Sequence, residues 1–156
     1  MKLENEILES LKNYIINNIN TSIDAVNTGN TIRLDDITKD SVVIDYPDTD
    51  SMKANVMFYI LPENESFSEF TLGGDLARFN NTVYIIVKKD NQENLIKKVF
   101  RYYGALMHCI KLDPSLASVV DETKFISMEF YPAVEANKNI VAIELHLEIT
   151  YEQDYQ

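Results

Sequence analysis

The spacing of the apolar residues changes along this chain, and that change limits the possible folds more than any other feature. From Glu4 to Val26 apolar residues recur every three or four positions, which predicts an amphipathic helix that ends at Gly29. Residues 90–113 show the same spacing and begin with an acidic capping sequence at Asp90. The proline after Asp113 ends this helix, and the next few residues predict one short helical turn.

Other apolar residues alternate with polar ones, as side chains do on the two faces of a β-strand. Residues 41–46 predict a short strand before a turn, and residues 53–61 predict a better strand that ends at Pro62. The β-branched run 82–88 predicts a third strand, which pairs with the second as a hairpin. This part of the chain thus predicts three strands between the two helices.

The C-terminal part of the chain alternates most regularly and predicts a second hairpin with a short polar connection. Its first strand, 125–131, places Ile126, Met128 and Phe130 on one face. Its second strand, 139–151, alternates apolar residues with glutamate and histidine. The predicted fold class is therefore α+β, with an antiparallel or mixed sheet of four to five strands packed against two long helices.

Residues 63–81 lie between the strands of the first predicted hairpin and show no regular spacing. We predict a long protruding loop with a tight turn at Gly73-Gly74, and a compact domain seldom has so long a loop without a use for it. Apolar side chains there, and tyrosines near strand ends or on second faces, favour an interface, although the phenylalanines could instead cover the subunit's own core. The predicted interface residues are Phe67, Phe70, Leu72, Phe79, Tyr59 and Tyr84, with Tyr102, Tyr131 and Tyr151 as further candidates.

Composition and charge exclude several classes of function. The 156 residues, 46 % hydrophobic and 25 % charged, predict one domain that spans residues 1–156. The formal net charge of -11 repels polyphosphate and anionic lipid, so neither sequence-specific nucleic-acid binding nor a membrane role is expected. The single cysteine, Cys109, allows no disulfide within the chain, and no signal peptide or membrane span is recognisable. We expect a protein made in a reducing cytoplasm.

The sequence shows no recognisable catalytic or metal-binding constellation. His108 and Cys109 are neighbours on a helix, so their side chains point about 100° apart and cannot face one another as a catalytic pair. His146 lies among glutamates without a second metal ligand, and the acidic turn at Asp48 and Asp50 lacks the glycine and glutamate of a calcium loop. We therefore expect no catalytic residues, no metal and no cofactor, although a site assembled between subunits stays open.

Two segments near the C-terminal end resemble a known family. The first is "KLDPSLASVVDET", with a leucine, aspartate, proline and leucine break after the second helix, and the second is "ISMEFYPAVEANKNIVAIELHLEITYEQ", which holds the paired late strands. Together with the order of helix, strands, helix and final hairpin, they resemble the tail terminator proteins of long-tailed bacteriophages, also described as tail completion or head–tail joining proteins. The resemblance covers most of the chain in element order and its second half in residues.

The resemblance implies an assembly function. Family members form a ring, usually of six subunits, that caps the finished tail tube, stops its polymerisation and joins it to the head connector while DNA passes through the lumen. The implied partners are further copies of the chain, the tail tube protein, the head–tail connector or stopper protein, and the tail sheath if the tail is contractile. The implied location is the tail–neck region of the virion. Six copies would carry 6 × -11 = -66 charges, so acidic lumen residues would keep DNA from sticking.

Two other interpretations fit the same residues. A head completion or connector-adaptor protein also forms a ring and differs mainly in its position in the particle. A small acidic monomeric domain that binds a basic partner, or mimics DNA, would share the composition and the fold class.

Overall fold

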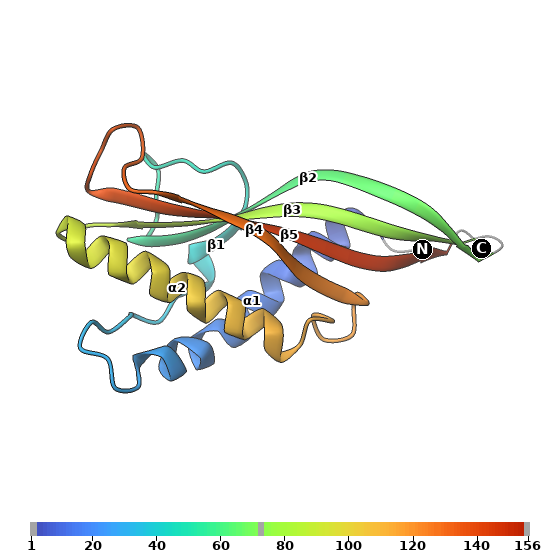
Figure 1. Cartoon of the computed structure of the whole chain (residues 1–156), viewed down its shortest axis with the longest axis horizontal. Coiled ribbons are helices and arrows are strands. Elements are labelled where there is room, and N and C mark those ends of the chain that lie inside the picture. Colours follow the sequence, from blue (N-terminus) through green and yellow to red (C-terminus); the bar gives the residue numbers. More distant parts are fainter. Residues whose placement is uncertain (1–2, 72–73, 155–156) are drawn as a thin grey trace.

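A mixed sheet with both long helices on one face forms the fold (Figure 1). The computed structural model describes residues 3–71 and 74–154, and in these residues the sheet has five strands in the order β1-β2-β3-β5-β4. Strand β1 is parallel to β2, and the other neighbours are antiparallel, so the predicted α+β class is confirmed. The elements are α1 (Glu4–Asn27), a short 3-10 turn η1 (Lys39–Ser41), β1 (Val42–Ile44), β2 (Val56–Thr71), β3 (Gly74–Lys88), α2 (Gln92–Leu112), β4 (Glu122–Tyr131) and β5 (Ile140–Asp154).

The two helices begin and end close to their predicted positions. At the start of α1 the Glu6 carboxylate accepts a hydrogen bond from the backbone N–H of Leu3, at 3.2 Å, and Gly29 after the helix has a positive φ of 75°. Helix α2 is capped by the side chain of Asn91 rather than by Asp90. The Asp90 carboxylate instead pairs with the ammonium group of Lys98, at 2.7 Å.

The short turn predicted after α2 exists, but it is left-handed and not the right-handed helical turn that we predicted. Residues 114–119 do form a turn, but Leu116, Ala117 and Ser118 have φ values of 52°, 60° and 67°. Such left-handed residues carry a steric cost because the side chain crowds the backbone. The Asp113 carboxylate stabilises this turn by accepting hydrogen bonds from the backbone N–H groups of Ser115 and Ala117, both at 3.1 Å.

Alternate residues of the strands pack against the helices. One row across the sheet joins Phe58, Ile85, Ile143 and Phe130 on β2, β3, β5 and β4, and the first three are fully buried. The ring of Tyr102 on α2 meets Phe58 edge to face, with centroids 6.3 Å apart. The main core therefore lies between the sheet and the two helices.

Asparagine side chains hold the irregular segment after α1. The side-chain amide of Asn27 donates to the carbonyl of Leu34 and accepts from its N–H, at 2.9 and 2.7 Å. One heptad earlier, Asn20 makes the same pair of hydrogen bonds to Ile37, at 3.0 and 2.9 Å. These two amides satisfy backbone groups that have no strand beside them.

The predicted loop 63–81 is wrong, because most of it is strand. Strand β2 continues through Pro62 to Thr71 and pairs with β3 from Asn81 back to Gly74. Pro62 is tolerated because β1 pairs only with residues 58–60, so β2 is an edge strand at the proline and needs no donor there. A bulge between Pro62 and Asn64 then changes which side chains face the helices.

Three strands extend past the helices as an arm, which we define as residues 62–71 of β2, 74–81 of β3 and 147–154 of β5. The base of the arm still packs in the core, since Phe79, Ile149 and Tyr151 belong to the core cluster. The last residues of β5 pair with the first residues of β3, and Asp154 lies opposite Gly74. Figure 1 shows these strands running past the first turn of α1 to the end of the molecule. The predicted protrusion therefore exists, but it is a three-stranded sheet.

A bulge also alters the predicted faces of β4. The register shifts between Phe125 and Ser127, so Ile126 leaves the ladder and its side chain is 56 % exposed. Phe125 packs against the core together with Met128 and Phe130. The prediction that Ile126 shares a face with Met128 is therefore wrong.

Candidate interaction surfaces

The sheet face opposite the helices, here called the outer face, holds a second apolar cluster. Met57, Tyr59, Ile86 and Ala142 form its buried part, and the connection from β1 to β2 covers it with Met52 and Ala54. Tyr59 is 4 % exposed, and its hydroxyl donates to the carbonyl of Asp48, at 3.2 Å. Within this protomer Tyr59 therefore holds a loop against the sheet.

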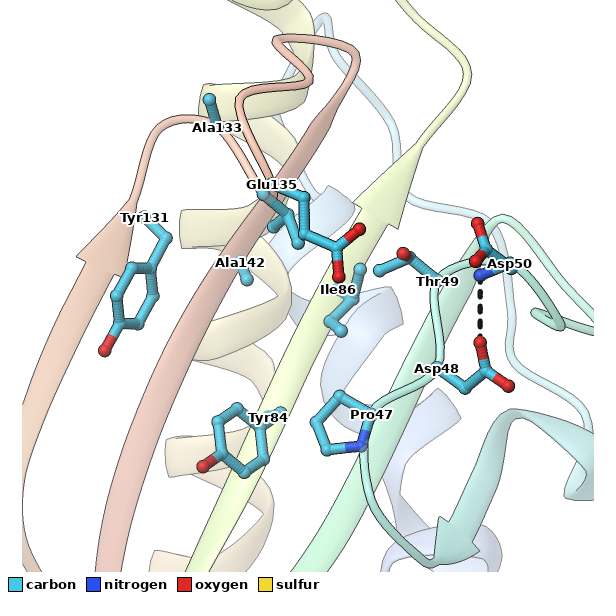
Figure 2. A pocket seen from close by; sticks show the side chains of 11 residues that line it. Pro47, Asp48, Thr49, Asp50, Tyr84, Ile86, Tyr131, Ala133, Glu135 and Ala142 are labelled. Atoms are coloured by element: carbon cyan, nitrogen blue, oxygen red, sulfur yellow. Dashed lines mark hydrogen bonds between the residues drawn. The ribbon is translucent and has the colours of Figure 1, made fainter.

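A pocket of about 310 Å³ opens on this outer face, between two loops that are far apart in the sequence. Ile86 and Ala142 form its floor, and the pocket wall on one side is the segment Pro47 to Asp50. The opposite wall is the β4–β5 connection at Ala133 to Glu135. Figure 2 shows the Glu135 carboxylate above Ile86, with the rings of Tyr84 and Tyr131 beside the floor. The pocket thus combines an apolar floor, two phenol rings and a carboxylate.

The Glu135 carboxylate has no partner among the residues that the structure describes. Neither a hydrogen bond nor an ion pair reaches it, and its residue is exposed to solvent. Glu135 and Ala136 both have positive φ, at 52° and 63°, in the tight connection that positions them. A bound group that enters the pocket would therefore meet an unpaired negative charge.

Two further carboxylates lie next to the pocket. Glu144 on β5 is directly opposite Glu129 on β4, and the hydroxyl of Tyr131 is 2.7 Å from an oxygen of each. The phenol has one proton, so it can donate to only one of the two carboxylates at a time. The Glu129 and Glu144 carboxylates raise the pKa of Tyr131, and burial together with Glu144 raises the pKa of Tyr84 to about 12. Both tyrosines are consequently neutral donors at physiological pH.

His146 occupies the neighbouring row of the outer face. Its Nδ1 is 3.2 Å from a carboxylate oxygen of Glu63 and 3.0 Å from the hydroxyl of Thr82, and its Nε2 is 3.8 Å from Glu144. The Glu63 side chain also accepts a hydrogen bond from Thr82. Glu63 reaches His146 from the bulge in β2, a contact that the spacing of the sequence does not reveal.

The predicted interface residues of the arm have different surroundings. Phe67 is 52 % exposed, opposite Ala77 near the tip. Phe79 is 5 % exposed and belongs to the core cluster, so its side chain is not available at the surface of this protomer. The side chain of Phe70, and Leu72 as a whole, lie outside the described residues. Among the predicted interface residues of the arm whose side chains the structure describes, Phe67 is thus the exposed one.

Most of the candidate tyrosines have structural contacts. Tyr102 and Tyr151 are buried, and their hydroxyls donate to the carbonyl of Asp35 and to the carboxylate of Glu65. Tyr84 is half-buried and Tyr131 is 38 % exposed, and both line the pocket. The pocket therefore unites two of the predicted residues with two turns that the sequence pattern did not connect with them.

The residues considered for catalysis or metal binding are dispersed. Cys109 is buried, which raises the pKa of its thiol to about 12, and His108 contacts the hydroxyl of Ser22 through Nδ1 at 2.9 Å. Within residues 3–71 and 74–154 no three His, Cys, Asp or Glu side chains are grouped so that they could hold a metal ion. In the same residues, neither helix is long and apolar enough to cross a membrane.

Comparison with known proteins gives little sequence similarity. No protein-family model matches the chain, and no curated protein matches it. Among solved structures, the chain is similar to one described as "Virion of native gene transfer agent (GTA) particle", with a TM-score of 0.41 and 10 % sequence identity. The match covers 88 % of this chain and 94 % of that one.

Proposed function

We propose that this protein is a virion structural subunit, a tail terminator of a long-tailed phage or phage-like particle. Copies of the chain would close into a ring, six in the family that the sequence resembles, which caps the tail tube and joins it to the head connector. The role is geometric and needs no catalytic residue. A closed ring built from one repeated contact has two different faces, so one face can match the tube and the other the connector.

The observation that carries the proposal is the three-stranded arm. It extends past the helices, has an exposed Phe67 near its tip, and presents residues 62–71 of β2 as an edge without a neighbouring strand among the described residues. Unpaired strand edges pair readily with other chains, and exposed aromatic side chains are typical anchors of interfaces. An arm of this kind is suited to reach a neighbouring subunit or the tube.

The other side of the sheet offers a second edge. Strand β4 is the last strand in the order, and its ten residues have a neighbour only in β5 within the described chain. Ile126 projects from the bulge of this strand. Two different free edges on one subunit satisfy the geometric need of a head-to-tail ring, in which each copy uses two distinct surfaces.

The test of this proposal is the mass of the purified protein, measured by light scattering over a concentration series with and without tail tubes. We expect a species near six times the subunit mass of 17.9 kDa, either free or on the tubes, and we expect it to stop tube growth. A monomer under both conditions would contradict the ring. A ring that leaves tube growth unchanged but binds the head connector would instead identify a head completion protein.

The arm is tested by Phe67→Ser. We expect the variant to fold as the wild type does, because Phe67 is half exposed, but to lose ring formation or tail-length control. The matched control is Tyr46→Ser, which removes a 72 % exposed aromatic ring outside the arm, in the connection from β1 to β2. Equal behaviour of the two variants would exclude the arm as the contact.

A further inference from the structure

We propose that the outer-face pocket is a binding site for an arginine side chain presented by a partner protein. The site is formed by Ile86, Ala142, Tyr84, Tyr131 and Glu135, and lies near the end of the sheet that is remote from the arm tip. It does not depend on the arm contact proposed above. The inference rests on the shape of the pocket and on charges that the described chain leaves without a counter-ion.

The charge of the pocket favours a cation. Glu135 has no ion-pair partner among the described residues. Glu129 and Glu144 lie directly opposite one another on neighbouring strands, where like charges repel, and they share the single hydroxyl proton of Tyr131. In the ion pairs of the described residues no lysine or arginine reaches these carboxylates, and the Nε2 of His146 lies 3.8 Å from Glu144. A positive charge between Glu135 and Tyr131 would offset this repulsion.

The lining of the pocket selects an organic cation over a metal ion. Ile86 and Ala142 offer carbon atoms at the floor, where a hydrated metal ion would lose water without gaining ligands. The tyrosine rings offer their faces to a planar cation, and Glu135 can accept from a guanidinium group. Arginine fits both, because its apolar stem packs on carbon while its planar head stacks and donates hydrogen bonds.

The size of the pocket agrees with this occupant. Its volume of about 310 Å³ lies at the lower end of the range of ligand sites, which is roughly 300–1,000 Å³, so one side chain with part of its backbone would fill it. A second copy of this chain is the less favourable source, because each copy carries a net charge of -11. We therefore assign the arginine to a different, basic partner segment.

Methyl NMR of the full chain tests the site. The probe is Nα-acetyl-arginine amide, titrated while the methyl signals of Ile86 and Ala142 are observed, and Nα-acetyl-citrulline amide is the neutral comparison of nearly equal shape. We expect saturable shifts for the arginine probe at millimolar concentration, and binding about tenfold weaker for citrulline, a difference of about 1.4 kcal/mol. Shifts of equal size with both probes, or none with either, would overturn the proposal.

Two variants locate the effect. Glu135→Gln should weaken binding of the arginine probe severalfold and leave the fold intact, because the carboxylate makes no hydrogen bond or ion pair within the described chain. Glu152→Gln, which removes an exposed carboxylate from the outer face of the arm, should leave binding unchanged. Equal weakening by both would mean that net charge alone attracts the probe. Concentration-dependent self-association that Glu135→Gln abolishes would identify a second copy as the occupant and contradict a separate partner.

Discussion

Single side chains decide how the segment after α1 is held. Asn27 and Asn20 lie one heptad apart on the helix, and each binds both backbone groups of a residue in an extended segment. The amide of asparagine carries a donor and an acceptor in one plane, so it imitates a strand neighbour. The sequence pattern predicted the helix but not these hydrogen bonds to the extended segment, because an asparagine on the polar side of a helix is ordinarily solvated.

We expect Asn27→Ala to lower the free energy of unfolding by about 2–4 kcal/mol, because a buried N–H and a buried carbonyl of Leu34 would both lose their partners. Denaturant unfolding measures the change. The control is Asn18→Ala, which removes one hydrogen bond to the carbonyl of Tyr14 within the helix and should cost less than about 1 kcal/mol. Similar losses for both variants would contradict this role of Asn27.

Glu65, Glu4 and Tyr151 form an acidic contact where the arm meets α1. Burial and the nearby Glu4 raise the pKa of Glu65, while hydrogen bonds to its own backbone and to Glu65 lower the pKa of Glu4. A raised carboxyl pKa means that the ionised form destabilises the fold. For Glu65, stability is therefore highest below the pKa of the unfolded chain and is lost as pH rises through the folded pKa.

Glu65→Gln should accordingly stabilise the protein at neutral pH by roughly 0.5–1 kcal/mol, since the amide oxygen still accepts from Tyr151 but no longer repels Glu4. The advantage should vanish when the pH falls below the ordinary carboxyl pKa, because wild-type Glu65 is then protonated in both states. Chemical unfolding at the two pH values measures it. An advantage that grows in acid would have the wrong sign for this account.

At the scale of elements, the sequence predicted regular segments well where one face is buried. Both helices and the C-terminal hairpin were found because their apolar residues repeat with a fixed period, and β1 was found from a short apolar run before a turn. The arm was missed for the opposite reason: most side chains in its part of β2 are exposed, whichever face they lie on, so no alternation marks it. Pro62 reinforced the error, because proline ends a central strand but not an edge strand.

The candidate site was less predictable than the fold. Tyr84 and Tyr131 were recognised as interface residues from their type and position, but the pocket also needs the turn at Pro47 and the turn at Glu135. These turns are separated by more than eighty residues, and a spacing pattern describes only neighbours along one element. Register between strands brings them together, and it is set by the bulges and turns of the whole sheet.

Two glycines allow an element-scale prediction with an internal control. Gly29 ends α1 with φ of 75°, and no atom lies within 4 Å of the place that a β-carbon would take there, so Gly29→Ala should cost about 1 kcal/mol from backbone strain alone. Gly104 lies inside α2 with equally open space, so Gly104→Ala should stabilise by about 0.5–1 kcal/mol. Thermal unfolding compares them. The same sign for both would show that backbone conformation and helix propensity do not govern these sites.

At the scale of the whole molecule, net charge opposes the proposed ring. Each subunit carries -11, and association brings these charges within reach of one another. Salt shortens that reach to about 8 Å at physiological ionic strength. We therefore expect the mass measured by light scattering at fixed protein concentration to rise with added salt. A mass that falls instead would indicate that ion pairs between copies outweigh the repulsion.

The arm also has a mechanical consequence. Its three strands run side by side, and their hydrogen bonds lie perpendicular to the strand direction. A pull along the arm, from tip to base, therefore loads the whole ladder at once, whereas a sideways pull on β2 opens it one residue pair after another. A contact at the tip would transmit tension through the arm into the sheet, and the arm would yield far more easily to peeling than to stretching.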